Sequence, residues 1–339
     1  MKRHLSIFSF KITKDAKKVI NNLLLLVIFI LSIQIVIFYI FQIGVTPELL
    51  DLKKNLKSYP DVIYFGDSVS IFVAKSDTDK LTLPQHIQQE IPRFIITTII
   101  HGAYNLNDYA NYSKLVSKSS VPPKIAVVSV NMRSFSPAWY KNPPYIFLKE
   151  HLFLTFDPFP VDAIYKPLYQ LHVLDLLQKY NFINFSNSPI YNGGNFVGRL
   201  SSFLKDDYGK SQEEKMKNKI MVNYMYSLSD EHELIKSMQF LAQRLNKKGI
   251  KVIFYITPID YQNAEKYWGN DFKDILEKNI QVIKKVAEAN SADYLDLSRS
   301  LDTNSFGWKE ETYVSEHLNE KGRKLVSHAI STFILAKSE

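Results

Sequence analysis

The first residues that could do chemistry stand directly after a predicted strand. In the segment DVIYFGDSVS, the apolar run Val62–Phe65 is followed at once by Gly66-Asp67-Ser68. Open α/β sheets present reactive groups at the carboxyl ends of their strands, and a glycine there lets the backbone bend sharply into a following helix. The amide N–H groups of that helix favour negative charge near Ser68, which is therefore a candidate nucleophile. The same tripeptide also fits a serine that only begins a helix.

The composition limits the other kinds of chemistry. The chain has 339 residues and no cysteine, which excludes thiolate catalysis, disulfides and cysteine-ligated zinc. No grouping of His, Asp and Glu has the spacing of a known metal site, and we expect no metal and no other cofactor. The net charge is +8, but +5 of it precedes the apolar run that begins at Leu23. The remainder is only mildly basic, so we do not expect nucleic acid as a partner.

Short apolar runs alternate with helical patterns after residue 60. The expected strands are Val62–Phe65, Phe94–Ile100, Lys124–Val130, Val252–Thr257 and Tyr294–Leu297. The expected helices are Asp108–Ser117, Glu231–Lys247, Phe272–Ala289 and Leu318–Ala336. Because the strands are apolar almost throughout, both faces of their sheet are expected to be covered. This order predicts a three-layer α/β/α domain with a parallel sheet.

Four segments together resemble the sequence blocks of the SGNH/GDSL hydrolase superfamily. IYFGDSVS is similar to the first block, and Ile100–Tyr104 (IHGAY) to the second. Ser129–Met132 (SVNM) matches the third block at its asparagine, and Glu316–Gly322 (EHLNEKG) resembles the last. Each block stands in the family order beside its expected element. The resemblance implies a flavodoxin-like fold and a serine hydrolase or acyltransferase.

The resemblance also implies roles for individual residues. Ser68 would be the nucleophile and His317 the base, which suits a neutral imidazole with an ordinary pKa of about 6.5. The backbone N–H groups of Ser68 and Gly102 and the side-chain amide of Asn131 would bind the oxyanion. Three simpler interpretations remain open: Gly102 permits a turn, Asn131 caps a turn, and His317 lies on the surface of a helix.

The sequence departs from the family pattern at the catalytic acid. The acid normally stands three residues before the histidine, where this chain has Val314. Glu316, beside His317, could turn inward to orient the imidazole; Glu311 or Asp302 could reach across a loop; or a backbone carbonyl could hold the ring. A catalytically inactive site is the remaining alternative. The third block departs as well, with Ser129 for glycine and Met132 for aspartate.

An uncharged run near the N-terminus predicts a membrane anchor. Leu23–Phe41 has only Ser32 and Gln34 as polar residues and is long enough to cross the bilayer. A cleaved signal peptide is the main alternative. The basic flank favours a cytoplasmic N-terminus. We therefore expect four parts: a cytoplasmic segment (1–22), a transmembrane helix (23–42), a linker (43–60), which could form a short helix, and an extracytoplasmic α/β domain (61–339).

A long aromatic-rich segment, about 133–229, interrupts the domain as an inserted subdomain or lid. Its surroundings resemble membrane-anchored bacterial SGNH-like proteins that act on envelope polymers. Four aromatic side chains could stack on sugars or lipid: Trp139, Tyr140, Tyr145 and Trp268. The expected partners are an envelope glycan or lipid, the membrane, and a membrane acyl-donor protein, in the periplasm if the cell is Gram-negative. The alternative is a non-catalytic envelope scaffold or polymer-binding protein.

Overall fold

The centre of the structure is a parallel β-sheet. The structure is a computed structural model that describes residues 14–41, 46–140, 147, 150–151, 154, 211–307 and 316–338. The strands are β1 (Val62–Gly66), β2 (Ile96–Ile100), β3 (Ile125–Val130), β4 (Lys251–Ile256) and β5 (Asp293–Asp296). They pair in parallel in the order β2-β1-β3-β4-β5, which is the flavodoxin-like order.

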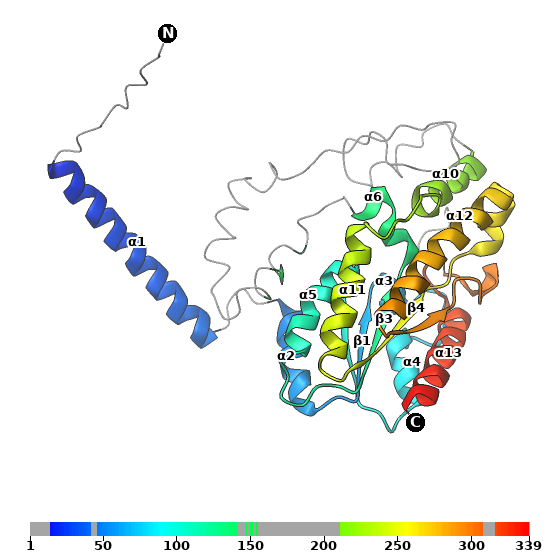
Figure 1. Cartoon of the computed structure of the whole chain (residues 1–339), viewed down its shortest axis with the longest axis horizontal. Coiled ribbons are helices and arrows are strands. Elements are labelled where there is room, and N and C mark those ends of the chain that lie inside the picture. Colours follow the sequence, from blue (N-terminus) through cyan, green and yellow to red (C-terminus); the bar gives the residue numbers. More distant parts are fainter. Residues whose placement is uncertain are drawn as a thin grey trace, which may run out of the picture.

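Helices cover both faces of this sheet (Figure 1). One face packs against α2 (Pro47–Asn55), α5 (Leu106–Val116), α11 (Glu233–Asn246) and α12 (Tyr261–Ala289). The other face packs against α4 (Leu83–Glu90) and α13 (Glu320–Ser338). Alternate residues of one strand enter the two cores: Ile63 and Phe65 face the first, and Val62 and Tyr64 face the second. The predicted three-layer α/β/α fold is confirmed.

The predicted elements match the structure closely, and the largest difference is in α12. All five strands lie within two residues of their expected bounds. Helix α12 begins at Tyr261, well before the expected start at Phe272, and Gly269 interrupts it with a φ of 54°. Because Gly269 has no Cβ, it adopts this left-handed conformation at little cost. Helix α4, which the sequence analysis does not predict, connects the Ser68 segment with β2.

Helix α1 (Lys14–Phe41) contains the predicted apolar run and begins nine residues before it. Its window Asp15–Ile33 is long and apolar enough to cross a membrane, and none of that window is buried in the protein. By length and composition, α1 is a candidate membrane span or signal sequence.

The segment expected to be a linker belongs in part to the folded domain. Within 43–60, α2 places Leu49 and Leu52 in the main core, and Leu56 of η1 (Leu56–Ser58) joins them. Pro47 at the start of α2 fits the first helical turn, where its missing N–H costs nothing. Residues 47–56 therefore correct the expected boundary at residue 61.

The structure describes the two ends of the expected insertion and four residues between them (147, 150–151 and 154). Its first end forms η2 (Met132–Phe135) and α6 (Pro137–Tyr140), and its last end forms α10 (Gln212–Tyr224). From α10, Ile220 and Met221 pack into the main core. Most of 141–210, including Tyr145, lies outside the described residues.

Gly66 ends β1 where neighbouring side chains leave no room for a Cβ. A Cβ there would clash with the Ser70 hydroxyl and lie 2.7 Å from a ring carbon of Tyr64. We expect Gly66→Ala to lower the free energy of unfolding by about 1–3 kcal/mol, because overpacking forces its neighbours to move. Urea denaturation of the full chain in detergent micelles measures this change.

Gly102→Ala is the matched control, because its Cβ would meet no heavy atom of the described residues within 4 Å. Equal stability of the two variants would contradict the packing argument.

Candidate functional site

Ser68 lies at the turn between β1 and a one-turn helix, α3 (Ser68–Ile71). Asp67 precedes it in an extended conformation and caps the helix, because its Oδ1 accepts a hydrogen bond from the Val69 N–H at 3.0 Å. The Ser68 side chain is partly exposed, whereas Asp67 is buried. The sequence motif therefore separates two roles: Asp67 holds the turn, and Ser68 faces outward.

Asn131 comes next to Asp67 from the end of β3. Its Nδ2 donates to Asp67 Oδ2 at 2.7 Å, and its Oδ1 accepts from the Arg133 N–H at 3.1 Å. Both side chains are buried. Burial raises the pKa of Asp67, while Arg133, the Asn131 amide and the Val69 N–H act in the opposite direction. The Asn131 amide is thus fixed beside the Ser68 turn.

His317 reaches the same region from the chain that precedes α13. Its carbonyl accepts from the Gly307 N–H at 2.6 Å, and its ring stacks on Phe72 with centroids 4.5 Å apart. The Phe72 N–H in turn donates to the Ser68 carbonyl at 3.0 Å. His317 therefore stacks on the residue that closes the helical turn begun by Ser68.

Glu316, one of the alternatives for the third residue, is buried and forms an ion pair with Arg133. Burial acts to raise the pKa of Glu316, but Arg133, His317 and Lys219 together lower it to about 2. The Arg133 guanidinium also lies over the Trp139 ring, 3.9 Å from its centroid. Glu316 is therefore ionised and close enough to His317 for their charges to interact.

The other candidates for the third residue are placed differently. Asp302 accepts from Ser305 and Lys321, each at 2.7 Å, and its side chain is 43% exposed. Glu311 and Val314 lie outside the described residues.

Gly102 follows β2 at the same edge of the sheet, where Ile100 pairs with Gly66. It is partly exposed, and its carbonyl oxygen lies 2.7 Å from His101 Nδ1. The positive φ in this turn belongs to Ala103, at 71°. Since Gly102 itself has neither a positive φ nor a crowded Cβ position, the backbone does not require a glycine there.

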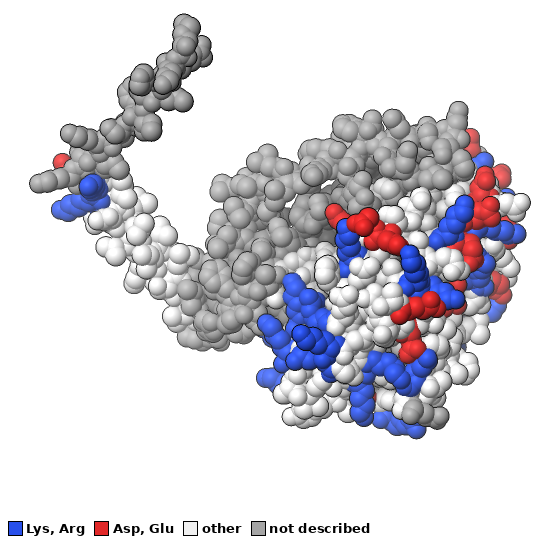
Figure 2. Space-filling view, in the orientation of Figure 1, with Lys and Arg blue, Asp and Glu red and all other residues white. Residues whose placement is uncertain are grey.

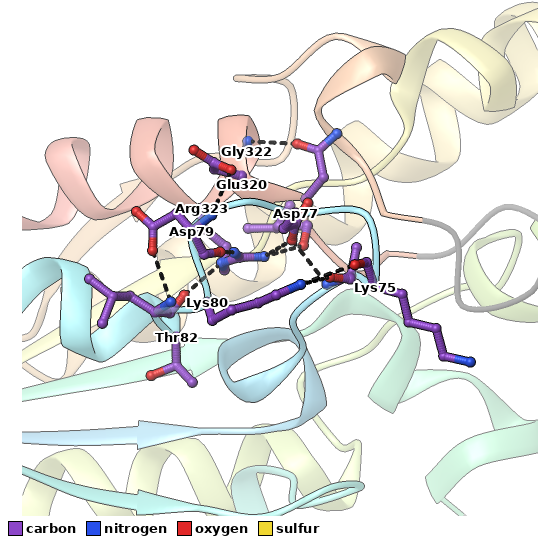
Figure 3. Close-up of polar contacts among 12 residues, drawn as sticks. Lys75, Asp77, Asp79, Lys80, Thr82, Glu320, Gly322 and Arg323 are labelled. Carbon is purple, nitrogen blue, oxygen red and sulfur yellow. Dashed lines mark hydrogen bonds and ion pairs between the residues drawn. The ribbon is translucent and has the colours of Figure 1, made fainter.

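Arg323 is a residue that sequence reasoning missed. It is fully buried and extends from α13 into loop 72–82, which follows α3 (Figure 3). Its guanidinium donates to Asp77 Oδ2 at 2.6 Å and to the carbonyls of Asp79 and Leu81 at 2.8 and 2.9 Å. Loop 72–82 begins with Phe72, the residue on which His317 stacks. Arg323 thus ties together the segments that carry Ser68 and His317.

Arg133 and Asp67 were also assigned no role from the sequence. For Arg133, the available signal in the sequence was its position: it is a charged residue two positions after Asn131, in a loop that leaves a buried strand.

Helix α10 also contributes to the surroundings of Glu316. Its residues Lys219 and Tyr224 lie near enough to Glu316 to interact with it electrostatically.

The two described tryptophans are engaged in packing. The Trp139 indole N–H donates to Asn223 Oδ1 at 2.8 Å, and that of Trp268 donates to the Lys217 carbonyl at 3.0 Å. Within the described parts of the chain, no group of three or more His, Asp or Glu residues is arranged to hold a metal ion.

No protein-family model and no curated protein matches the chain. Among solved structures, the chain is similar to an acetylxylan esterase from Geobacillus stearothermophilus, with 12% identity and a TM-score of 0.40 over 81% of this chain and 94% of that one. It is also similar to a carbohydrate acetylesterase from Sinorhizobium meliloti, with 9% identity and a TM-score of 0.37 over 81% and 98% of the two chains.

The buried Arg133–Glu316 pair predicts a pH-dependent stability. Glu316→Gln leaves the guanidinium without its partner and should cost about 3–5 kcal/mol of unfolding free energy at neutral pH. Because the folded-state pKa of Glu316, about 2, is below the ordinary 4.5, its carboxylate stabilises the fold above pH 4.5. That contribution is lost as the pH falls toward 2, so wild type and variant should converge over this range in urea titrations.

The double variant Arg133→Met/Glu316→Gln is the control, since it removes both charges and should recover most of the loss. A Glu316→Gln effect that does not change with pH would contradict the assignment.

The geometry of Arg323 predicts that lysine cannot replace it. Three separate acceptors in loop 72–82 match the planar fork of a guanidinium and not a single ammonium. We expect Arg323→Lys to lower the free energy of unfolding by about 2–4 kcal/mol, as hydrogen bonds to a charged group are lost. Lys324→Gln, on the exposed face of the same helix, should have little effect. Equal melting curves for the two variants would overturn this role.

Proposed function

We propose that this protein is a membrane-anchored serine esterase or O-acyltransferase that acts on an acyl ester of a cell-envelope polysaccharide or lipid. Helix α1 is the anchor, with the basic N-terminal segment in the cytoplasm and the α/β domain on the other side of the membrane. In a Gram-negative cell, this places the domain in the periplasm. The observation that carries the proposal is the contact of His317 with Phe72, one helical turn from Ser68.

The reaction begins with attack of Ser68 Oγ on the ester carbonyl while His317 accepts the hydroxyl proton. The tetrahedral intermediate collapses as His317 returns this proton to the leaving alcohol, and an acyl-enzyme remains. Water or a sugar hydroxyl then attacks the acyl-enzyme, with His317 again as the base. Hydrolysis and acyl transfer thus share the first step, and a membrane acyl-donor protein would be the partner for transfer.

Three donors would stabilise the oxyanion: the backbone N–H groups of Ser68 and Gly102 and the side-chain amide of Asn131. The Asn131 Nδ2 carries two hydrogens, one of which goes to Asp67. The hydrogen bond to Asp67 fixes the plane of the amide, so its second hydrogen has a defined direction. Asp67 is therefore a positioning residue in this mechanism.

Glu316 would supply the negative charge that a third catalytic residue normally provides. Its low pKa keeps it ionised at every pH at which a histidine titrates, near 6.5. A nearby carboxylate favours the imidazolium that forms when His317 takes the serine proton. Its ion pair with Arg133 holds the carboxylate in place.

The test uses the full chain in detergent micelles with a fluorophosphonate probe and a short-chain p-nitrophenyl ester. We expect Ser68→Ala and His317→Gln to abolish labelling and turnover, and Asn131→Ala to reduce turnover about 100- to 1000-fold. The matched controls are Ser120→Ala and His328→Gln, which change exposed residues away from the site and should retain activity.

If the folded wild type is neither labelled nor active, the site does not hold an activated serine. That result would contradict the proposal and favour the non-catalytic scaffold. Labelling that survives Ser68→Ala would instead assign the nucleophile to another residue.

A further inference from the structure

The edge of the sheet opposite Ser68 carries a repeated pattern of basic and exposed apolar residues. The loops that lead into β1, β2 and β3 each contain a basic residue followed closely by an exposed apolar one. These pairs are Lys57 with Tyr59, Arg93 with Ile95, and Lys118 with Val121. The apolar members are 60%, 53% and 47% exposed, respectively. We name this surface, with the basic residues described next, the basic-apolar edge.

The three loops form one continuous surface. Strands β2, β1 and β3 are neighbours, so the loops that precede them lie side by side. Backbone hydrogen bonds connect them: the Asp61 N–H donates to the Ile95 carbonyl, and the Lys124 N–H donates to the Asp61 carbonyl, both at 2.9 Å. The exposed apolar side chains therefore occupy one face and are not scattered over the protein.

The helices that end at this edge add further positive charge. These residues are Lys53 and Lys54 of α2, Lys114 of α5, and Arg244, Lys247 and Lys248 at the end of α11. Burial lowers the pKa of Lys114, and the neighbouring charges of Arg244 and Lys118 lower it further.

Like charges are thus held within interaction range of one another. The acids here include Asp51 on α2, Asp61, which pairs with Lys124, and Glu90 at the end of α4, which contacts His328. In Figure 2, Lys and Arg gather over the end of the domain where α2 and α5 lie.

The covalent path limits how far this edge can lie from the candidate membrane helix. Helix α1 ends at Phe41, and the folded domain begins with α2 at Pro47. The five peptide steps from Phe41 to Thr46 span at most about 18 Å, and the nine residues of α2 add about 14 Å between this attachment and the edge. Lys53 and Lys54 lie in the last turn of α2, and the chain then passes directly into the loop that carries Lys57 and Tyr59.

We propose that the basic-apolar edge binds the surface of an anionic phospholipid bilayer. Lysine and arginine attract the phosphate headgroups, and the attraction acts over about a Debye length, ~10 Å at moderate salt. Exposed Tyr59, Ile95 and Val121 favour a bilayer over a soluble polyanion, because a bilayer offers an apolar layer just below the charged one. The connection to α1, followed by α2, is short enough to keep the edge within reach of the bilayer surface.

The proposed orientation favours one of the two substrate classes of the proposed function, a polysaccharide or a lipid. This step therefore rests on the proposed function. Ser68 lies at the carboxyl end of β1, and the basic-apolar edge lies at the amino end. A strand of five residues separates the two by about 17 Å, before the loops are added. A domain that stands on this edge directs Ser68 away from the bilayer, so its substrate is an envelope glycan and not a lipid within the membrane.

The absence of cysteine allows a direct test. Ser120→Cys introduces a single thiol in the loop before β3, and Ser76→Cys introduces one in loop 72–82 near the Ser68 edge; both serines are exposed. The full chain, labelled at either thiol with a donor dye, is reconstituted in nanodiscs that contain acceptor-labelled lipid. The discs hold phosphatidylcholine alone or an equal mixture with phosphatidylglycerol, and energy transfer is measured at low and high salt.

We expect higher transfer from Ser120→Cys than from Ser76→Cys in anionic discs, and a smaller difference in neutral discs or at high salt. Four exposed lysines of the edge are replaced together by glutamine: Lys54, Lys57, Lys118 and Lys248. The matched control replaces four exposed lysines of α12: Lys266, Lys278, Lys284 and Lys285. Only the first set should abolish the dependence on anionic lipid.

A second pair of variants tests the apolar contacts. Ile95→Ser with Val121→Ser should reduce the transfer from Ser120→Cys, whereas Phe240→Ser with Leu325→Ser, at exposed positions on α11 and α13, should not. Transfer that is equal from the two labels, or insensitive to lipid charge and salt, would overturn the proposal. Binding of the edge to a soluble polyanion, with no response to anionic discs, would assign it to a polymer instead. None of these readouts requires catalysis, so they fail or succeed independently of the esterase assay.

Discussion

The uniform direction of the five strands is the constraint on which the other features depend. In a parallel sheet, every strand ends at one edge and every connecting helix ends at the other. Ser68, Gly102 and Asn131 each follow the end of a strand, so the fold brings them together without any direct signal between their sequences. The same rule gathers the last turns of α2, α5 and α11 at the opposite edge, where basic residues also suit the helix dipoles.

Two acidic side chains, Asp67 and Glu316, are buried near Ser68, and both interact with one cation, Arg133. A buried charge without a partner costs several kcal/mol, so Asp67 and Glu316 at this depth both depend on Arg133. The Arg133 guanidinium does not affect the pKa values of these two carboxyl groups equally. Burial raises the pKa of Asp67 although Arg133 acts to lower it, whereas Arg133, which pairs directly with Glu316, lowers the pKa of that carboxyl group against its burial. Asp67 relies instead on hydrogen bonds from the Asn131 amide and the Val69 N–H, and these set the geometry beside Ser68.

The sequence predicts those structural features that depend on local patterns of residues. Short and largely apolar runs locate the strands, and the position of Ser68 at the end of the first follows from them. Contacts between distant residues leave no such pattern. Nothing near Glu316 indicates that Arg133 is its partner, and nothing near Arg323 indicates that its acceptors lie in loop 72–82. Helix α2 shows a different limit: Leu49 and Leu52 predict an amphipathic helix, but not the core that it joins.

The position of helix α1 in the sequence has its own structural consequence. Helix α1 is followed by α2, and α2 leads into the amino end of β1, so the chain enters the sheet at the edge opposite Ser68. Under the proposed anchoring, the domain is tethered at the start of α2, and that helix runs from the attachment to this edge. A tether at one point limits distance but does not by itself fix an orientation. In the proposed membrane contact, charged and apolar residues of three adjacent loops supply what the tether lacks, because a surface held at several separated points has one orientation. Under that proposal, the site faces the space in which envelope polymers lie.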